Sequence, residues 1–87
     1  MSTLLRVKYH KNGQLSTKAT IVDGLFEGEC LHYYTTGQTK KLERFRNGLL
    51  EGKVVRYLRN GTVSSVKYYK DGKDITERMK VIKEILS

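Results

Sequence analysis

The sequence has no proline, a single cysteine and no long apolar run. Without proline, every backbone N–H can join a hydrogen-bonded ladder. The lone Cys30 excludes an internal disulfide, which is typical of a reducing compartment. No stretch approaches the roughly 18 apolar residues of a membrane span, and Met1 to Leu5 do not form the apolar region of a signal peptide. We therefore expect a cytoplasmic protein that does not engage membranes.

Acidic residues are scarce relative to basic ones, which gives a formal net charge of +8 over 87 residues. The length predicts a single domain spanning residues 1–87. A domain this small has little apolar material for both a core and a deep catalytic pocket. The basic excess favours an acidic partner, such as nucleic acid, an anionic membrane surface, a nucleotide or an acidic protein. It also fits a solvated surface that only keeps the protein in solution.

Glycine and tyrosine recur at a 24-residue step, which is the strongest pattern in the sequence. The recurring positions are Gly13, Gly37 and Gly61, then Gly24, Gly48 and Gly72, and also Tyr9, Tyr33 and Tyr57. The step predicts three repeats over residues 5–28, 29–52 and 53–73. The third copy departs at its end, where Thr76 replaces the glycine found at positions 28 and 52.

Most of the repeated glycines follow Asn or Asp, a dipeptide that favours tight hairpin turns. The intervening segments predict six strands at 4–11, 14–22, 26–35, 39–46, 50–59 and 62–70, which would form an antiparallel meander. Alternation places Leu5, Val7 and Tyr9 on one face with Leu31 and Val55, so stacked copies should share one apolar core. We expect Tyr33 and Tyr57 to pack there too.

The hydrophobic period becomes helical at the end of the chain. Ile75, Met79, Ile82 and Leu86 form a stripe at i, i+4, i+7 and i+11, which predicts a helix over 75–86. Asp74 is expected to cap it, with Glu77 in its first turn. Such a helix would cover the open edge of the last repeat.

The Y-x-x-N-G turn, the D/N-G-L-x-E-G turn and the 24-residue step resemble those of MORN-repeat proteins, more closely the bacterial variant of that repeat. The resemblance covers residues 5–73 and implies a single-layer, curved meander of β-hairpins. It implies binding or scaffolding rather than catalysis, as in the antitoxin half of some bacterial toxin–antitoxin modules.

Residue types that carry chemistry are few, and we expect no enzyme, no cofactor and no metal site. Cys30 and His32 share a strand face, but His32 is the repeat copy of Lys8 and Arg56, which favours a structural position. The two histidines are far apart in sequence, and no clustered Cys or Asp set completes a metal site. Glu27 and Glu51 are repeat equivalents at turns, which indicates a structural role.

One ordered set of basic side chains is the candidate binding site. Lys8, His32 and Arg56 should form an outward column, about 9–10 Å apart on alternate strands. The remaining candidates extend this column or add charge nearby, and they are Arg6, Lys11, Arg44, Arg46, Arg59 and Lys70. Tyr34 and Tyr68 fall opposite the core tyrosines and are candidates for exposed aromatic contacts. Charged outward positions also serve to block edge aggregation.

Two functions remain open on these grounds. The first is a protein-binding module that neutralises or scaffolds a partner protein, in which Lys8, Arg56 and Arg59 contact acidic groups. The second is a nucleic-acid or nucleotide binder, or a small phage or mobile-element inhibitor, that uses the same basic face. The interface could instead lie on the C-terminal helix or on the turns around Glu27 and Glu51.

Overall fold

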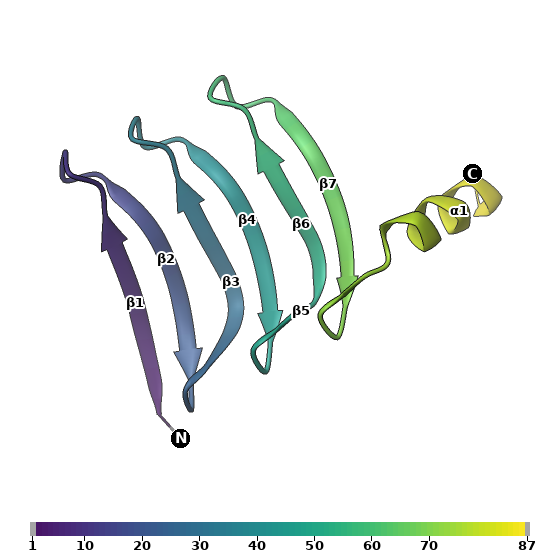
Figure 1. Ribbon diagram of the computed structural model, residues 1–87, viewed down its shortest axis with the longest axis horizontal. Coiled ribbons are helices and arrows are strands. Elements are labelled where there is room, and N and C mark those ends of the chain that lie inside the picture. Colours follow the sequence, from purple (N-terminus) through teal and green to yellow (C-terminus); the bar gives the residue numbers. More distant parts are fainter. Residues whose placement is uncertain (1, 87) are drawn as a thin grey trace.

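A computed structural model describes residues 2–86, and the side chains of residues 82–86 lie outside the described part. The chain forms one antiparallel sheet followed by a helix (Figure 1). Its strands are β1 (Thr3–Tyr9), β2 (Leu15–Val22), β3 (Leu25–Tyr33), β4 (Thr39–Arg46), β5 (Leu49–Leu50), β6 (Gly52–Tyr57), β7 (Val63–Lys70) and β8 (Lys73–Asp74). Strand order follows the sequence, and β5 pairs only with β4. The predicted meander is confirmed.

The turns at one end of the sheet are two-residue hairpin turns, as their sequences predict. Asp23-Gly24 joins β2 to β3 with φ of 49° and 84°, and Asp71-Gly72 joins β7 to β8 with φ of 49° and 81°. Positive φ at both central residues defines the type I′ turn, whose twist matches that of the flanking strands. Asn47-Gly48 has the same conformation between β4 and β5.

At the opposite end, the strands stop earlier than predicted. β1, β3 and β6 end at Tyr9, Tyr33 and Tyr57, before the Asn-Gly or Thr-Gly pairs. The next residues form longer loops closed by backbone bonds, such as His10 N–H to Gln14 O at 2.8 Å. The register shifts beside each of these tyrosines, so the ladder ends in a bulge and not directly in a turn.

Two further irregularities bend the sheet. The predicted strand over 50–59 is divided into β5 and β6 at Glu51, and the β2–β3 register is shifted between Ala19 and Ile21. Gly28 and Gly52 lie beside these breaks with φ of 78° and 86°. Bulges of this kind curve a strand, and β3 and the β5–β6 segment bend visibly in Figure 1.

Alternation along the strands gives the sheet two faces, which we name after one buried residue on each. The Cys30 face carries Arg6, Lys8, Ala19, Cys30, His32, Lys41, Glu43, Val54 and Arg56. The Val55 face carries Val7, Lys18, Leu31, Leu42, Val55 and Val66, which lie in one row across the sheet.

The expectation of one apolar core is wrong. Among the described residues, the buried apolar side chains are Ala19, Cys30 and Val54 on the Cys30 face and Val55 on the other. A single layer has no second layer to cover either face, so burial is split between the two. Tyr9, assigned to the core, is 68% exposed, and Leu5 is 61% exposed. Both lie on β1, which has no outer strand neighbour.

The helix α1 spans Thr76–Leu86, one residue later than predicted at its start. Asp74 Oδ1 accepts hydrogen bonds from the backbone N–H and the hydroxyl of Thr76, so the carboxylate does cap this end. Glu77 pairs with Lys80 at 3.6 Å. Ile75 and Met79 are half-buried, whereas the side chains of Ile82 and Leu86 lie outside the described residues. In Figure 1 α1 extends beyond the β7 edge of the sheet.

Candidate binding face

The predicted basic column exists as a row on the Cys30 face. The strand register pairs Lys8 with Thr17, Thr17 with His32, His32 with Lys41, and Lys41 with Arg56. Adjacent strands lie about 4.8 Å apart, so Lys8, His32 and Arg56 recur at about 9.6 Å. Lys41 was not predicted, and it adds a fourth basic residue to the row. A row of cations on one face is suited to an anionic surface.

Arg6 lies on the same face, one row further along β1. The strand register pairs Arg6 with Ala19, Ala19 with Cys30, and Cys30 with Glu43. Among the described residues, Arg6, Lys8 and Arg56 are exposed and make no ion pair with an acidic group. Their charges are therefore available to a partner.

The remaining predicted cations are not gathered at this row. Arg44, Arg46 and Lys70 point to the Val55 face, because they alternate with Phe45 or with Tyr69 on the other face. Arg44 pairs with Glu29 at 3.1 Å, and Lys70 pairs with Glu51 at 3.1 Å. Exposed pairs of this kind contribute little stability but reduce the charge offered to a partner.

Lys11 and Arg59 lie in the loops beyond β1 and β6. The Arg59 guanidinium stands 5.7 Å from the centroid of the Tyr34 ring, and Lys40 Nζ stands 5.8 Å from the same centroid. Both distances are within the range of a cation–π contact. Arg59 is thus engaged with the chain itself, unlike Lys8 and Arg56.

Tyr34 is not the exposed aromatic that the sequence indicated. It is half-buried, and its hydroxyl donates to the backbone carbonyl of Tyr57 at 2.6 Å. His10, the equivalent residue one repeat earlier, makes the same kind of contact: its Nε2 donates to the carbonyl of Tyr33 at 2.9 Å. Each contact ties one hairpin to the next, 23 residues ahead. Tyr68 is half-buried as well.

The middle of the Cys30 face holds a polar cluster that the sequence did not reveal. His32 Nε2 lies 2.7 Å from Glu43 Oε1 and 3.6 Å from Cys30 Sγ, while Lys41 Nζ lies 3.3 Å from Glu43 Oε2. Burial raises the pKa of the Cys30 thiol, the nearby Glu43 carboxylate raises it further, and Lys41 opposes this. Cys30 and His32 lie two residues apart on β3, but Glu43 lies beside them only because β3 pairs with β4 at Cys30–Glu43.

A shallow depression of about 290 Å³ surrounds this cluster. Its polar lining comes from Arg6, Lys8, Thr17, His32 and Glu43, and its apolar lining from Ala19, Phe26, Cys30 and Phe45. The Phe26 and Phe45 rings meet at 5.2 Å between centroids and form one wall. The face is therefore hollowed at its centre, with cations on the β1 side.

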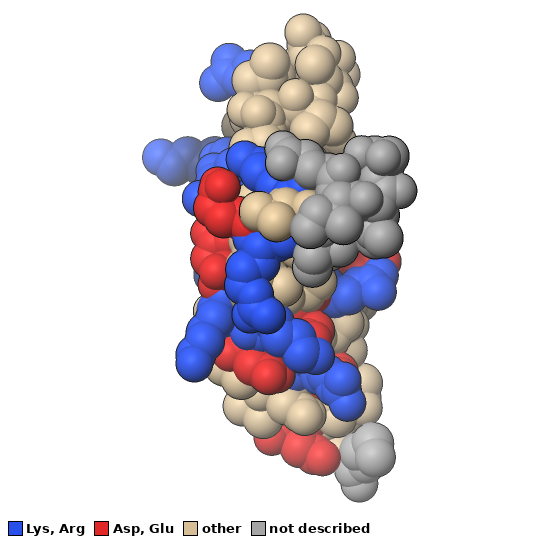
Figure 2. Space-filling model, turned by 90° about the vertical axis from the view of Figure 1, so that its right-hand side faces the viewer, with Lys and Arg blue, Asp and Glu red and all other residues tan. Residues whose placement is uncertain are grey.

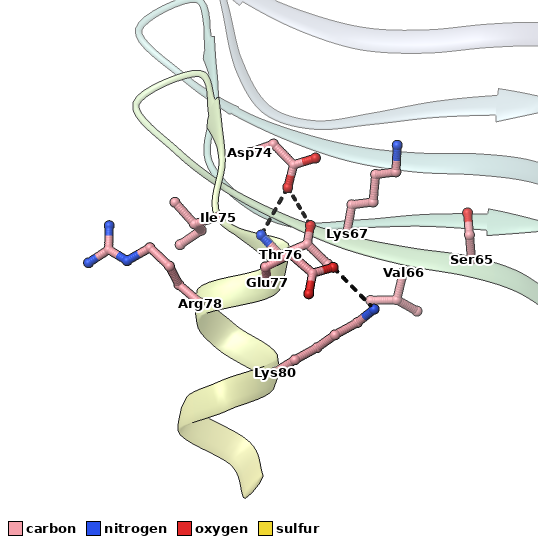
Figure 3. Close-up of a pocket in the computed structure, with 9 residues that line it drawn as sticks. All are labelled: Ser65, Val66, Lys67, Asp74, Ile75, Thr76, Glu77, Arg78 and Lys80. Atoms are coloured by element: carbon pink, nitrogen blue, oxygen red, sulfur yellow. Dashed lines mark hydrogen bonds and ion pairs between the residues drawn. The ribbon is translucent and has the colours of Figure 1, made fainter. Parts of the chain in front are cut away.

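A second hollow lies where the sheet meets α1 (Figure 3). Its residues come from β7, from Asp74 at the end of β8 and from the start of the helix. Asp74 is hydrogen-bonded to Thr76, and Glu77 forms an ion pair with Lys80. Figure 2, viewed from this end, shows Lys and Arg side chains close together with Asp and Glu between them. Charge of both signs makes this end a weaker candidate for binding an anion than the Cys30 face.

Comparison with known families agrees with the hairpin geometry. The family model for the MORN repeat variant matches residues 26–47, which run from β3 through β4 into the following turn. The match supports a MORN-repeat protein. The match covers one copy of the 24-residue step, so the count of three MORN repeats remains a prediction from the sequence. A search of curated proteins and a search of solved structures found no match to the chain.

In the part of the chain that the structure describes, no helix is long and apolar enough to cross a membrane. The MORN repeat variant and the β-hairpins support a repeat-based binding module. Its Cys30 face combines exposed cations that have no acidic partner among the described residues with a central depression.

Proposed function

We propose that the chain is a non-enzymatic protein-binding module that engages an acidic partner through the Cys30 face. The observation that carries the proposal is the set of exposed cations, Arg6, Lys8 and Arg56, on one face without acidic partners among the described residues. Cations fixed by strand register form a regular array, which favours fast association and selects partners of opposite charge.

The shape of the chain supports this use. The principal extents are 46 × 38 × 15 Å, so the molecule is a slab with two broad faces. A stable protein interface buries about 800 Å² on each partner, and a face of this width can supply that area. The central depression, with its Phe26–Phe45 wall, offers an apolar anchor point beside the cations.

We infer an antitoxin-like role, in which the module neutralises one partner protein, as the specific form of this function. Its small size and stacked hairpins suit a binder that occludes a surface rather than transforms a substrate. We propose that the chain acts in the cytoplasm, because Cys30 is a free thiol and reducing compartments keep thiols free.

A nucleic acid or nucleotide is the second candidate ligand, and the same row of cations favours it. Phosphate contacts would give binding a steep dependence on salt, because each neutralised phosphate releases a counterion. A small phage or mobile-element inhibitor that uses the same basic face belongs with this second candidate. If it bound an acidic host protein, its binding would not depend on nucleic acid.

Affinity capture from lysate of the source organism, with and without nuclease, separates the two candidates. We expect the immobilised chain to retain a specific protein after nuclease treatment, identified by mass spectrometry. The recombinant partner should then bind the chain in purified form. Loss of all retained material after nuclease, together with saturable binding to generic DNA or RNA, would refute a protein partner.

A further inference from the structure

Three side chains able to bind a metal ion converge on the Cys30 face. Cys30 Sγ, His32 Nε2 and one Glu43 oxygen all lie within 4.8 Å of one another. Cys30 is 5% exposed, and the Glu43 side chain is 12% exposed, so both are largely shielded from bulk water. All three line the central depression.

One edge between these atoms already has the length of an edge in a tetrahedral site, and the Glu43 carboxylate must move to complete the other two. Zinc–sulfur bonds of about 2.3 Å and zinc–nitrogen bonds of about 2.1 Å place sulfur and nitrogen about 3.6 Å apart. The Cys30 Sγ–His32 Nε2 distance is 3.6 Å. His32 Nε2 and Glu43 Oε1 lie 2.7 Å apart, and an outward swing of the carboxylate by under about 1 Å would open this edge to its tetrahedral length.

We propose that Cys30, His32 and Glu43 form a three-ligand site for a thiophilic divalent cation such as Zn²⁺, with a fourth position open to the depression. Three protein ligands and one open position are the arrangement that zinc adopts where an outside ligand completes the site. Thiolate and imidazole select zinc-like ions over Mg²⁺ or Ca²⁺, which prefer oxygen.

Charge and proton balance follow from the ligand set. On binding, the thiol proton of Cys30 leaves for solvent, a metal–sulfur bond forms, and the ion sheds its displaced waters. One thiolate and one carboxylate then neutralise the divalent charge. Arg6 and Lys8 line the same depression, so the open position suits water or an anionic ligand.

Lys41 opposes the ion. Its ammonium lies 3.3 Å from the second oxygen of Glu43, where it competes for the carboxylate and repels a cation. Removing this charge should therefore tighten the site while leaving all three ligands in place.

Titration of the reduced full chain with Co²⁺ tests the site, because Cys30 is the only source of a cysteine–cobalt charge-transfer band. We expect a saturable near-ultraviolet band, lost on addition of Zn²⁺ and absent in Cys30→Ser. Glu43→Gln and His32→Gln should each weaken Co²⁺ binding by more than about tenfold. Glu29→Gln, a carboxylate next to Cys30 on the opposite face, is the matched control and should bind as the wild type does.

The Lys41→Gln variant distinguishes the proposal from misfolding. The proposal requires this variant to bind Co²⁺ more tightly, whereas misfolding would only weaken binding. Circular dichroism verifies the sheet in each variant. The proposal is overturned if the wild type shows no saturable band, if Glu43→Gln and His32→Gln bind as the wild type does, or if Lys41→Gln binds more weakly.

Discussion

Tyr34 shows how a single side chain joins one hairpin to the next. The sequence places it after a strand and suggests an exposed ring, but its hydroxyl reaches the Tyr57 carbonyl at 2.6 Å. That partner lies 23 residues away, and only the stacking of hairpins brings the two groups together. A lone residue type does not reveal such a contact.

Tyr34→Phe should lower the free energy of unfolding by about 1 kcal/mol, because it leaves the Tyr57 carbonyl without this donor. Tyr9→Phe is the matched control, since Tyr9 is 68% exposed and should change stability little. Urea denaturation measures both. Equal stability of the two variants would show that the Tyr34 hydroxyl contributes nothing to the joint between hairpins.

Glu51 makes the corresponding contact at the other end of the sheet. Its carboxylate accepts the Asp71 backbone N–H at 3.0 Å and pairs with Lys70 at 3.1 Å. The Asp71 hydrogen bond, followed by the Lys70 contact, holds the pKa of Glu51 below its ordinary value. Glu27 repeats the contact with the Asn47 N–H at 2.7 Å. The structural role predicted for both acids from their repetition agrees with these bonds.

Because folding lowers the pKa of Glu51, its charge stabilises the fold above the ordinary glutamate pKa of about 4.3 and ceases to do so as the pH falls through the folded value. Glu51→Gln should therefore destabilise the chain at neutral pH, with a difference from wild type that shrinks as the pH falls below the ordinary glutamate pKa. Glu77→Gln, on the exposed start of α1, should show a much smaller effect. A difference that grows in acid would contradict the assignment.

At the scale of elements, the turns were the best predicted part. Asn or Asp followed by Gly identified the three type I′ turns, because few other dipeptides accept positive φ twice. The same dipeptide did not form a two-residue turn at Asn12-Gly13 or Asn60-Gly61, which lie in longer loops. Strand ends were predicted less well. The bulges beside Tyr9, Tyr33 and Tyr57 and the break at Glu51 arise from pairing with neighbouring strands, which no local pattern encodes.

Gly48 lies in the type I′ turn between β4 and β5, with φ of 83°. Gly48→Ala should cost about 1–2 kcal/mol from this backbone conformation alone. An added methyl would also meet Leu25 Cδ2 at 3.2 Å, whereas at Gly24, with φ of 84°, it would meet no atom within 4 Å. Thermal unfolding should thus show both variants destabilised, Gly48→Ala more than Gly24→Ala. A stabilised Gly48→Ala would contradict this turn geometry.

At the scale of the whole molecule, the sheet is open on both faces. The radius of gyration is 14.8 Å, against about 12 Å for a compact chain of this length. The sequence identified the apolar row of Val7, Leu31 and Val55 correctly. It did not reveal that the opposite face also buries Ala19, Cys30 and Val54, because alternation assigns residues to faces without saying what covers them.

The candidate site, like the fold, could be predicted only in part from the sequence. Repeat spacing alone placed Lys8, His32 and Arg56 on one row, since equivalent residues of stacked hairpins share a face. The Glu43 contact with His32 could not be predicted, because it depends on the exact β3–β4 register.

Binding of the captured partner to two matched triple variants tests the central proposal most directly. Arg6→Ala, Lys8→Ala and Arg56→Ala together remove three cations from the Cys30 face. The second variant removes the same charge from three exposed lysines whose strand positions place them on the Val55 face, by Lys18→Ala, Lys53→Ala and Lys73→Ala. Net charge is therefore equal in the two proteins, and only its location differs.

Titration calorimetry at low salt should show the partner binding about tenfold or more weakly to the Cys30-face variant, with slower association. The Val55-face variant should retain nearly wild-type affinity, and both should unfold at temperatures close to that of the wild type. Equal affinity of the two variants, or a greater loss in the Val55-face variant, would contradict binding through the Cys30 face.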